Sequence, residues 1–296
     1  MYLKDSKFSR FKITVQDNCS TDDTIEVFQF FKSNYGSCFK NLSLISNLYN
    51  VGGSVNFLKA IELSQSKYTW VLCDDDVIDT SDIEDVLKVL EEDDFDLIHV
   101  GAHPEKERTI FQLKETPRKL IEMGYRYFAY SSFIPCNIFK TALFQNDFLI
   151  EGYKNVVNSY PHMPYLFNVF LEDKPIYVSK KQIVTARIEG QSYNMHEWLK
   201  WWINTSKMLS SKNNVRLAFF DQFKSLDDNL KIDYDSVFYF FNISELQNNK
   251  LQIDFRKDFF SLKEKIGFML YNMEKKISYF RRILKKIKLL FEMNLK

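Results

Sequence analysis

An apolar run that ends in three consecutive carboxylates, between Tyr68 and Asp76, constrains this chain more than any other feature. The run Tyr-Thr-Trp-Val-Leu-Cys reads as a buried strand, and it stops at Asp74, Asp75 and Asp76. Three carboxylates at one strand end repel one another, so a fold retains them where a cation, usually a divalent metal, neutralises them. Open α/β sheets also bind ligands at this end of their strands. The competing interpretation is a solvated turn that caps the next helix.

The composition is that of a globular protein long enough to be an enzyme. The chain has 296 residues, 45% of them hydrophobic, which is enough for one large domain or one domain with an appendage. Its 40 Lys and Arg balance 39 Asp and Glu, so net charge does not indicate a nucleic acid partner. The four cysteines lack the spacing of a zinc site or a disulfide framework, which favours a reducing, cytoplasmic setting. No apolar stretch is long enough to predict a membrane span.

Alternating strand and helix patterns predict an α/β fold with a mostly parallel sheet flanked by helices. Besides the apolar run, strands are predicted at residues 11–16, 42–46 and 96–100, and helices at 54–65, 81–92 and 118–130. This order is typical of parallel βαβ units, which gather the residues at the C-terminal strand ends along one edge of the sheet.

Polar turns follow the first two strands. Asp17 and Asn18 stand at the tip of the first strand, where capping of the next helix leaves both unexplained. The second strand is followed by Asn50-Val-Gly-Gly-Ser-Val-Asn56, in which Gly52 and Gly53 permit a tight turn and a close backbone approach to a ligand. A Gly-Gly pair by itself is more often an ordinary loop.

The chain resembles the family 2 glycosyltransferases of the GT-A fold in three ordered segments: Val15-Gln-Asp-Asn-Cys-Ser-Thr-Asp-Asp-Thr24, Asn50-Val-Gly-Gly-Ser-Val-Asn56 and Leu72-Cys-Asp-Asp-Asp-Val77. The resemblance covers residues 11–100 well. From residue 100 to about residue 190 the resemblance is weaker. There the chain is similar to abequosyltransferase-like enzymes, which build bacterial surface polysaccharides such as capsule or lipopolysaccharide. It implies a metal-dependent, inverting transferase that moves a sugar from a nucleotide sugar, typically UDP-linked, to a surface glycan or lipid-linked acceptor.

The resemblance also implies roles for individual residues. Asp17 would hydrogen-bond the nucleotide base and Asp74 would face the ribose. Asp76, the last residue of the Asp-x-Asp motif, would coordinate Mn²⁺ or Mg²⁺ on the diphosphate, as hard oxygen ligands do. Asp75 would lie in the donor site as little more than a spacer. The other expected donor-binding residues are Asn18, Asn50, Gly52, Gly53 and Asn56.

The chain departs from the family pattern at its start. Family members normally have a strand and a helix ahead of the strand that begins here near Lys12, and only residues 1–10 precede it in this sequence. The absent strand would lie between the strands that end at Asp17 and Asp74, and its loss would leave both without a partner. A misassigned start codon and a truncated gene product are favoured over a divergent fold, and both predict a poorly folded or inactive 296-residue form. A non-catalytic binding or scaffold module is the alternative function.

The catalytic base is expected between residues 150 and 165. An inverting transferase needs one group within hydrogen-bond reach of the acceptor hydroxyl. The family usually supplies a carboxylate, often within an acidic pair, and this segment has no such pair. His162, just before a helix predicted from Tyr165 to Leu171, is the first candidate, and Glu151 is the second. A structural histidine and a surface glutamate fit the pattern equally well.

The C-terminal third has a different pattern. Residues 176–179 are predicted to form a last strand, and residues 184–198 a loop over the donor, with Arg187, Ser192 and His196 as candidate contacts to the diphosphate or the metal. Helical periodicity then begins, so the expected domains are a glycosyltransferase domain at 1–197 and a helical region at 198–296.

The last 34 residues, 263–296, predict a basic amphipathic helix. They carry ten Lys or Arg against three acids, with apolar residues at helical spacing. Such a helix suits an anionic membrane surface, where a lipid-linked acceptor would be presented. A helix packed on the protein, with a solvated basic face, is the alternative. The expected location is cytoplasmic, with peripheral attachment to the inner face of the bacterial plasma membrane as one option.

Overall fold

The structure, a computed structural model, describes residues 11–35, 41–102, 108, 112–185, 201 and 205. The chain divides into two compact units, 1–227 and 228–296, and every described residue belongs to the first. The expected domain boundary at 197, the basic helix at 263–296, and Arg187, Ser192 and His196 lie outside the described residues. Within the described part of the chain, no helix has the length and apolar character needed to cross a membrane.

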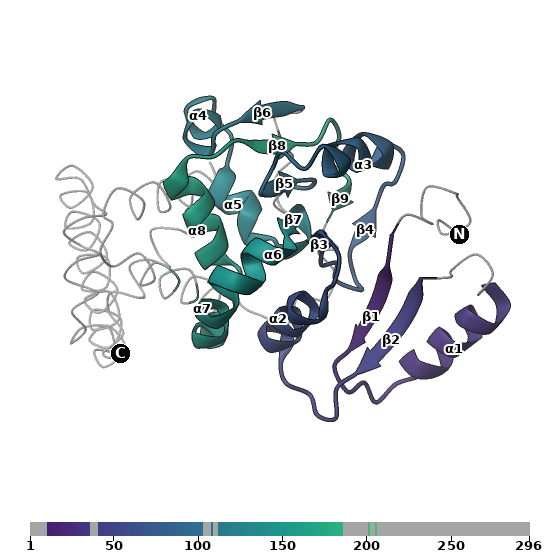
Figure 1. The fold of residues 1–296 in the computed structure, drawn as a ribbon. Helices are drawn as coiled ribbons and strands as arrows, with labels where there is room; N and C mark the ends of the chain where they lie inside the picture. The colour runs from purple at the N-terminus through teal and green to yellow at the C-terminus, as the bar shows by residue number, and fades with distance from the viewer. Residues whose placement is uncertain are drawn as a thin grey trace, which may run out of the picture. The chain divides into compact units, whose positions relative to one another are not determined.

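The largest sheet has five strands in the order β3-β7-β5-β8-β6 (Figure 1). Their bounds are Tyr68–Trp70 for β3, Asn137–Lys140 for β7, Leu97–His99 for β5, Ile176–Val178 for β8 and Leu113–Glu115 for β6. β5 and β8 are parallel, whereas β7 is antiparallel to β3 and β5, and β6 is antiparallel to β8. The predicted α/β class is confirmed. The sheet is mixed, because β7 inserts between two strands that would otherwise be parallel neighbours.

A separate parallel pair precedes this sheet. β1 (Ile13–Asp17) pairs with β2 (Leu42–Ser46), in register from Ile13 opposite Leu42 to Asp17 opposite Ser46. α1 (Thr24–Tyr35) joins the two strands and buries Phe28. In the described residues neither strand pairs with β3. The strands that lead to Asp17 and to the three aspartates therefore belong to different sheets.

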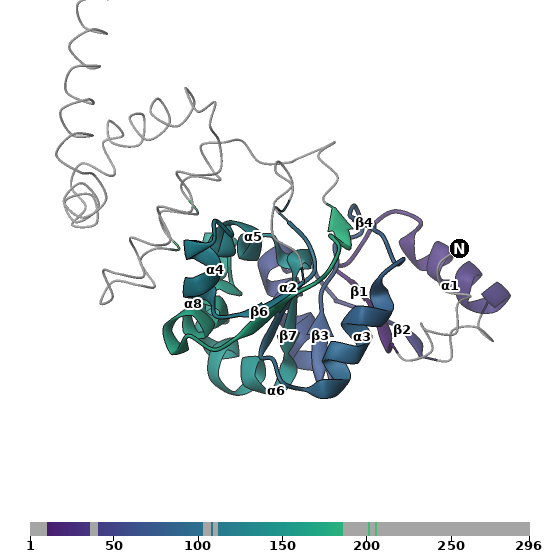
Figure 2. The ribbon, with the colours of Figure 1, turned by 90° about the horizontal axis from the view of Figure 1, so that it is seen from above.

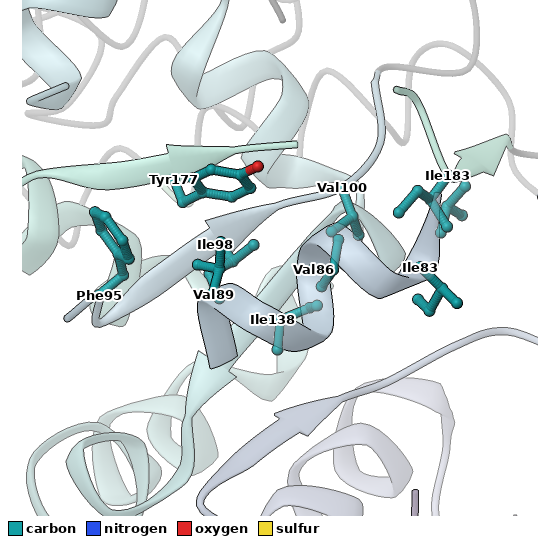
Figure 3. Close-up of a cluster of buried hydrophobic side chains, with 10 residues drawn as sticks. Ile83, Val86, Val89, Phe95, Ile98, Val100, Ile138, Tyr177 and Ile183 are labelled. Carbon is teal, nitrogen blue, oxygen red and sulfur yellow. The ribbon is translucent and has the colours of Figure 1, made fainter. Parts of the chain in front are cut away.

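One hydrophobic core lies between the five-stranded sheet and α3 (Ile83–Glu92), as Figure 3 shows. α3 presents apolar residues to the sheet at a spacing of three residues, which places them on one helix face. The buried members are Ile83, Val86, Val89, Phe95, Ile98, Val100, Ile138, Tyr177, Ile183 and Val184. Phe11, which precedes β1, packs against this cluster together with Tyr68 and Trp70. The residue that leads into the N-terminal strand pair thus packs against the main core.

Aromatic rings fill a second core under α2 (Gly53–Leu63). The Phe57 ring lies 6.0 Å from that of Phe139 and 6.1 Å from that of Phe144. On the same helix, Leu58 and Ile61 have no exposed surface. α2 is consequently fixed to the rest of the described chain through an apolar face.

The helix predicted at 118–130 is two helices, α4 (Pro117–Glu122) and α5 (Tyr127–Ser132). Gly124 has φ +89°, a left-handed conformation that favours glycine. Its N–H donates to the Ile121 carbonyl, and the Tyr125 N–H donates to the Leu120 carbonyl, closing α4. This glycine is the local signal that the sequence prediction passed over.

The remaining described elements are short apart from α8 (Met163–Glu172), as Figure 2 shows from above. β4 (Val77–Ile78) pairs with β9 (Val184–Thr185) in antiparallel fashion. The others are α6 (Thr141–Leu143), a π-helical turn (Phe144–Phe148), α7 (Leu149–Lys154), and 3-10 turns at Ile134–Cys136 and Val156–Asn158.

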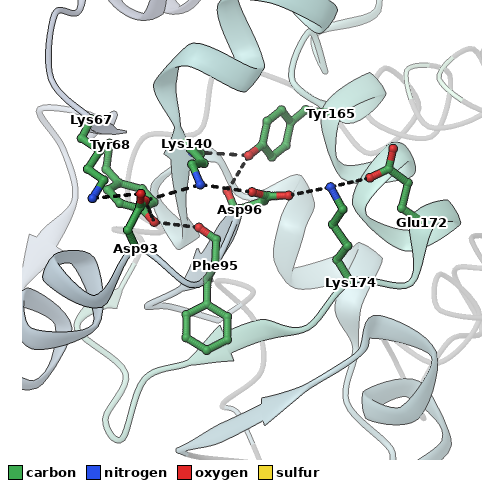
Figure 4. Close-up of polar contacts among 9 residues, drawn as sticks. All are labelled: Lys67, Tyr68, Asp93, Phe95, Asp96, Lys140, Tyr165, Glu172 and Lys174. Carbon is green, nitrogen blue, oxygen red and sulfur yellow. Dashed lines mark hydrogen bonds and ion pairs between the residues drawn. The ribbon is translucent and has the colours of Figure 1, made fainter.

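A charged network fastens the end of the large sheet opposite the three aspartates (Figure 4). Asp96, just before β5, pairs with Lys140 at the end of β7 (3.6 Å) and with Lys174 (3.1 Å). Asp93 accepts a hydrogen bond from the Tyr68 hydroxyl (2.9 Å) and pairs with Lys67 (2.9 Å). Because β7 runs against β3 and β5, its end lies beside their beginnings, and the network clamps all three.

Candidate active site

The turn after β3 brings a thiol and two carboxylates together. The ligand atoms of Cys73, Asp75 and Asp76 all lie within 4.8 Å of one another. The Asp76 N–H donates to the Cys73 carbonyl (3.4 Å), which curls the turn. Asp74 is exposed and is not part of this group. The structure thus joins Asp75, expected to be a spacer, to the predicted metal ligand Asp76, and it adds Cys73, which the sequence reasoning missed.

The electrostatics of this turn favour a bound cation. Burial raises the pKa of Asp76 to about 6, and the Asp75 carboxylate raises that pKa as well. Cys73 is exposed as a residue, yet shielding of its sulfur from water raises the pKa of the thiol to about 12, with help from Asp76 and Asp75. Like charges packed at this distance oppose further ionisation, and a divalent cation would relieve that repulsion.

The donor set fits a divalent metal ion. The Oδ2 atom of Asp76 is buried, and among the described residues it has no hydrogen-bond partner. A buried carboxylate oxygen without a partner is costly unless a ligand satisfies it. Carboxylate oxygens are the ligands that Mn²⁺ and Mg²⁺ take in proteins.

Asp17 ends β1 as a buried carboxylate with 5% of its surface exposed. Its Oδ1 accepts a hydrogen bond from the Ser20 N–H at 3.0 Å. Hydrogen bonds from Ser20 lower the pKa of Asp17, against the opposing effect of burial. The carboxylate is therefore ionised at neutral pH and oriented by the turn that follows the strand.

Asn47 is the centre of an amide network that links β1, β2 and α2. Its Nδ2 donates to Asn18 Oδ1 (3.0 Å) and to Asn56 Oδ1 (2.8 Å), and its backbone N–H donates to the Asp17 carbonyl (2.9 Å). Its Oδ1 accepts from Lys59 Nζ and from Gln16 Nε2 (3.3 Å). Asn47 and Lys59 were not among the predicted site residues.

The predicted donor-binding residues Asn18, Asn50 and Asn56 lie in the same network. Asn18 Nδ2 donates to Asn50 Oδ1 (2.9 Å), and Asn18 Oδ1 accepts from the Val51 N–H (3.0 Å). Asn56 Nδ2 donates to the Gln16 carbonyl (3.3 Å). In this conformation the three side-chain amides stabilise the loop between β2 and α2.

Gly52 and Gly53 start α2. Gly52 has φ +81°, and a Cβ at either position would meet no atom within 4 Å. The Gly52 N–H donates to Asn50 Oδ1 (2.9 Å). Open space over two glycines at a helix start leaves room for a ligand to approach the backbone.

The two candidate bases lie in contrasting places. His162 has no exposed surface; its Nε2 lies 2.9 Å from the Ser131 carbonyl, and its ring is 5.7 Å from Phe57. Burial lowers the pKa of His162 to about 4. Glu151 is exposed on α7 and pairs with Lys154 at 2.6 Å. This placement does not support His162 as a group that meets an acceptor hydroxyl, because the ring is enclosed in the aromatic core.

A second histidine is buried near the first. His99 has no exposed surface; its Nδ1 lies 3.0 Å from the Tyr125 hydroxyl and its Nε2 lies 3.1 Å from Ser131 Oγ. Burial, followed by the charge of Arg108, lowers the pKa of His99 to about 3. Both histidines are therefore neutral parts of the core at neutral pH.

Comparison with known proteins adds a family and a fold. The model of glycosyl transferase family 2 matches residues 3–152. No curated protein matches the chain. Among solved structures, S. aureus TarS 1–349 in complex with UDP has a TM-score of 0.54 at 17% identity, over 76% of this chain and 66% of that chain.

The same TarS fragment in complex with UDP-GlcNAc has a TM-score of 0.55 at 16% identity, over 80% of this chain and 73% of that one. A longer TarS structure has a TM-score of 0.54 at 17% identity, over 79% of this chain and 43% of its own. At these identities the likeness concerns the fold, and this chain spans between 43% and 73% of the three TarS chains.

Proposed function

The chain belongs to glycosyl transferase family 2, and on that premise we propose that it transfers a sugar from a UDP-linked donor to a bacterial surface glycan or a lipid-linked acceptor, with inversion. The structures of TarS with UDP and UDP-GlcNAc support a uridine nucleotide as the carrier. Capsule and lipopolysaccharide are the glycans that the sequence resemblance implies.

The observation that carries the proposal is the pair of carboxylates after β3. Asp76 and Asp75 would hold Mn²⁺ or Mg²⁺, with the buried Asp76 Oδ2 supplying one ligand. When bound, the ion would neutralise the charge that develops on the departing nucleoside diphosphate. Metal dependence is part of the proposal.

The nucleoside would be bound by the other strand tip. The ionised Asp17 carboxylate can accept a hydrogen bond from a base N–H, and the amide network centred on Asn47 holds the strand end in place. Asp74, exposed beside the metal group, can accept from ribose hydroxyls. Asn50, Gly52 and Gly53 would shape the loop over the donor.

Membrane attachment belongs to residues 263–296, whose basic and apolar residues would bind anionic lipid at the inner face of the plasma membrane. Co-sedimentation with anionic vesicles would test this directly. Equal binding by the full chain and by a chain ending at residue 262 would rule out residues 263–296 as the anchor.

Calorimetry with UDP tests the proposal. UDP should bind in the presence of Mn²⁺, and the affinity should fall at least about tenfold in Asp76→Asn, because a carboxylate ligand is lost. Asp79→Asn is a matched control, since Asp79 lies three residues on and its Oδ1 is occupied by the Ser81 N–H. Release of UDP from a panel of UDP-sugars, measured with the same variants, would then identify the donor.

A failure to bind UDP with or without Mn²⁺ would contradict the proposal and favour the binding or scaffold module. The observation behind that alternative is the separation of β1 from β3 in the described residues.

A further inference from the structure

We propose that Cys73 is a ligand of the metal, and that it gives the site a preference for thiophilic divalent cations such as Co²⁺, Zn²⁺ and Cd²⁺ over Mg²⁺, with Mn²⁺ between them. The inference rests on the proposed donor site. It adds a sulfur ligand to a site expected to contain oxygen ligands only.

The first argument is distance. Cys73 Sγ and one oxygen each from Asp75 and Asp76 lie within 4.8 Å of one another. Metal–sulfur and metal–oxygen bonds of about 2.3 and 2.1 Å place two ligands of one ion roughly 3.6 Å apart in tetrahedral geometry and at most about 4.4 Å apart. Small side-chain rotations on an open turn bring the three atoms to those separations.

The second argument is that packing does not explain this thiol. Cys73 is exposed as a residue and forms no disulfide, whereas Cys136 is a free thiol buried in the core. Cysteine is usually a small buried residue, and its chemistry decides its role where it is exposed. Here the sulfur stands beside two carboxylates and near the one buried Asp76 oxygen that has no partner in the described residues.

The third argument concerns ligand softness. Thiolate sulfur binds zinc and other soft or borderline ions more strongly than it binds magnesium, which takes oxygen ligands almost exclusively. On binding, the thiol releases one proton to solvent and its sulfur forms the metal bond, so the two carboxylates and the thiolate outweigh the charge of the cation.

Cobalt titration of the reduced, full-length chain tests the inference, because a cobalt–thiolate bond has a charge-transfer absorption that cobalt–carboxylate bonds lack. CoCl₂ should produce this band at one equivalent, with or without UDP, and Cys73→Ser should abolish it. The same variant should bind Cd²⁺ roughly tenfold more weakly while its Mg²⁺ affinity changes less than about threefold. Cys19→Ser should retain the band, which controls for the other thiols.

Three results would overturn the inference. The first is a band that persists in Cys73→Ser. The second is Co²⁺ binding without a thiolate band, which leaves a carboxylate site and the proposed function intact. The third is the absence of any metal binding, with UDP present or absent, which removes the metal from the proposed function as well. Asp76→Asn, which should lose both Co²⁺ and Mg²⁺, shows whether the Co²⁺ of the second result is bound at this site.

Discussion

Asn47 donates a hydrogen bond through Nδ2 to Oδ1 of Asn56 at 2.8 Å, and this contact joins the loop after β2 to the first turn of α2. The same amide donates to Asn18 and accepts from Lys59 and Gln16. Asn47 is buried, with 7% of its surface exposed, so its bonds form largely away from water. One side chain therefore aligns three segments that carry the predicted donor-binding residues.

Asn47→Ala should destabilise the protein by about 1–3 kcal/mol, because it leaves several half-buried polar partners unsatisfied. UDP affinity should fall with it, since the loop and the tip of β1 lose their common support. Urea unfolding and calorimetry measure the two effects. Asn34→Ala is the control: Asn34 donates to the Phe30 carbonyl at 2.8 Å but is exposed, and its loss should cost less than about 1 kcal/mol. Equal losses in the two variants would contradict the assigned role.

Gly152→Ala should loosen the packing of α7 on α2. A Cβ at Gly152 would meet Leu58 Cδ2 at 2.7 Å and the Pro161 carbonyl oxygen at 2.9 Å. Overpacking of this kind costs about 1–3 kcal/mol. Gly53→Ala is the matched comparison, because a Cβ there meets no atom within 4 Å, and its stability should change by less than about 1 kcal/mol. Thermal unfolding of both variants measures the two stabilities. If Gly152→Ala is as stable as the unaltered chain, the contact between α7 and α2 can rearrange to accept a methyl group.

Acid should destabilise the fold from about pH 6.5 downward. Burial lowers the pKa of His99 to about 3 and that of His162 to about 4, from a usual value of 6.5. Below pH 6.5 the unfolded chain binds protons that the folded chain excludes, so the free energy of unfolding falls by about 1.4 kcal/mol per histidine and pH unit. The contribution is fully present above pH 6.5 and declines until the folded pKa values are reached.

Urea unfolding between pH 7.5 and 5 measures this slope. The measurement is made in Asp76→Asn, because the pKa of Asp76 is raised to about 6 and its protonation in the folded chain would oppose the slope. His162→Gln removes one of the two titrating groups and should roughly halve the slope. A free energy of unfolding that is constant over this range would show that the histidines are accessible to protons in the folded chain.

Asp96→Asn should weaken the clamp at the opposite end of the large sheet. The Asp96 side chain is 17% exposed and is paired with Lys140 and Lys174, and its loss should cost about 1–3 kcal/mol, less in high salt. Glu122→Gln removes a pair with Lys119 in which both side chains are more than half exposed, and it should cost at most about 0.5 kcal/mol. Comparable effects of the two substitutions in urea unfolding would argue against a clamp.

Local patterns predicted the elements that carry the site. Short apolar segments predicted β1 and β2, helical periodicity predicted α2 and α3, and the polar residues that follow the strands singled out Asp17 and Asp76 as candidates. These features depend on residues that are close in the sequence, so a single sequence is enough to predict them. The family could also be predicted from a single sequence, because the three segments that carry the resemblance are short and follow one another in a fixed order.

What the sequence reasoning missed depends on contacts between distant residues. The insertion of β7 between β3 and β5 is set by the tertiary fold, and Asn47 acquires its role from Asn18, which lies 29 residues away. His162 resembles a candidate base until Phe57 and Phe139 are seen to enclose it. Cys73 sits one residue before the motif, and only the curl of the turn brings its sulfur to the carboxylates.

The separation of β1–β2 from the large sheet has a thermodynamic consequence. In the described residues the strand pair shares no strand pairing with the large sheet, and the Phe11 contact and the amide bonds to α2 help to join it to the rest of the fold, so we expect it to open more readily than the large sheet. A UDP-sugar that bound Asp17 at the end of β1 and a metal held by Asp75 and Asp76 after β3 would bridge the two sheets. Ligand at 100 times its dissociation constant stabilises the bound state by about 2.7 kcal/mol. That stabilisation would be concentrated in the strand pair, as slower amide exchange at residues 13–17 and 42–46, and donor binding would then complete the folding of the site that receives it.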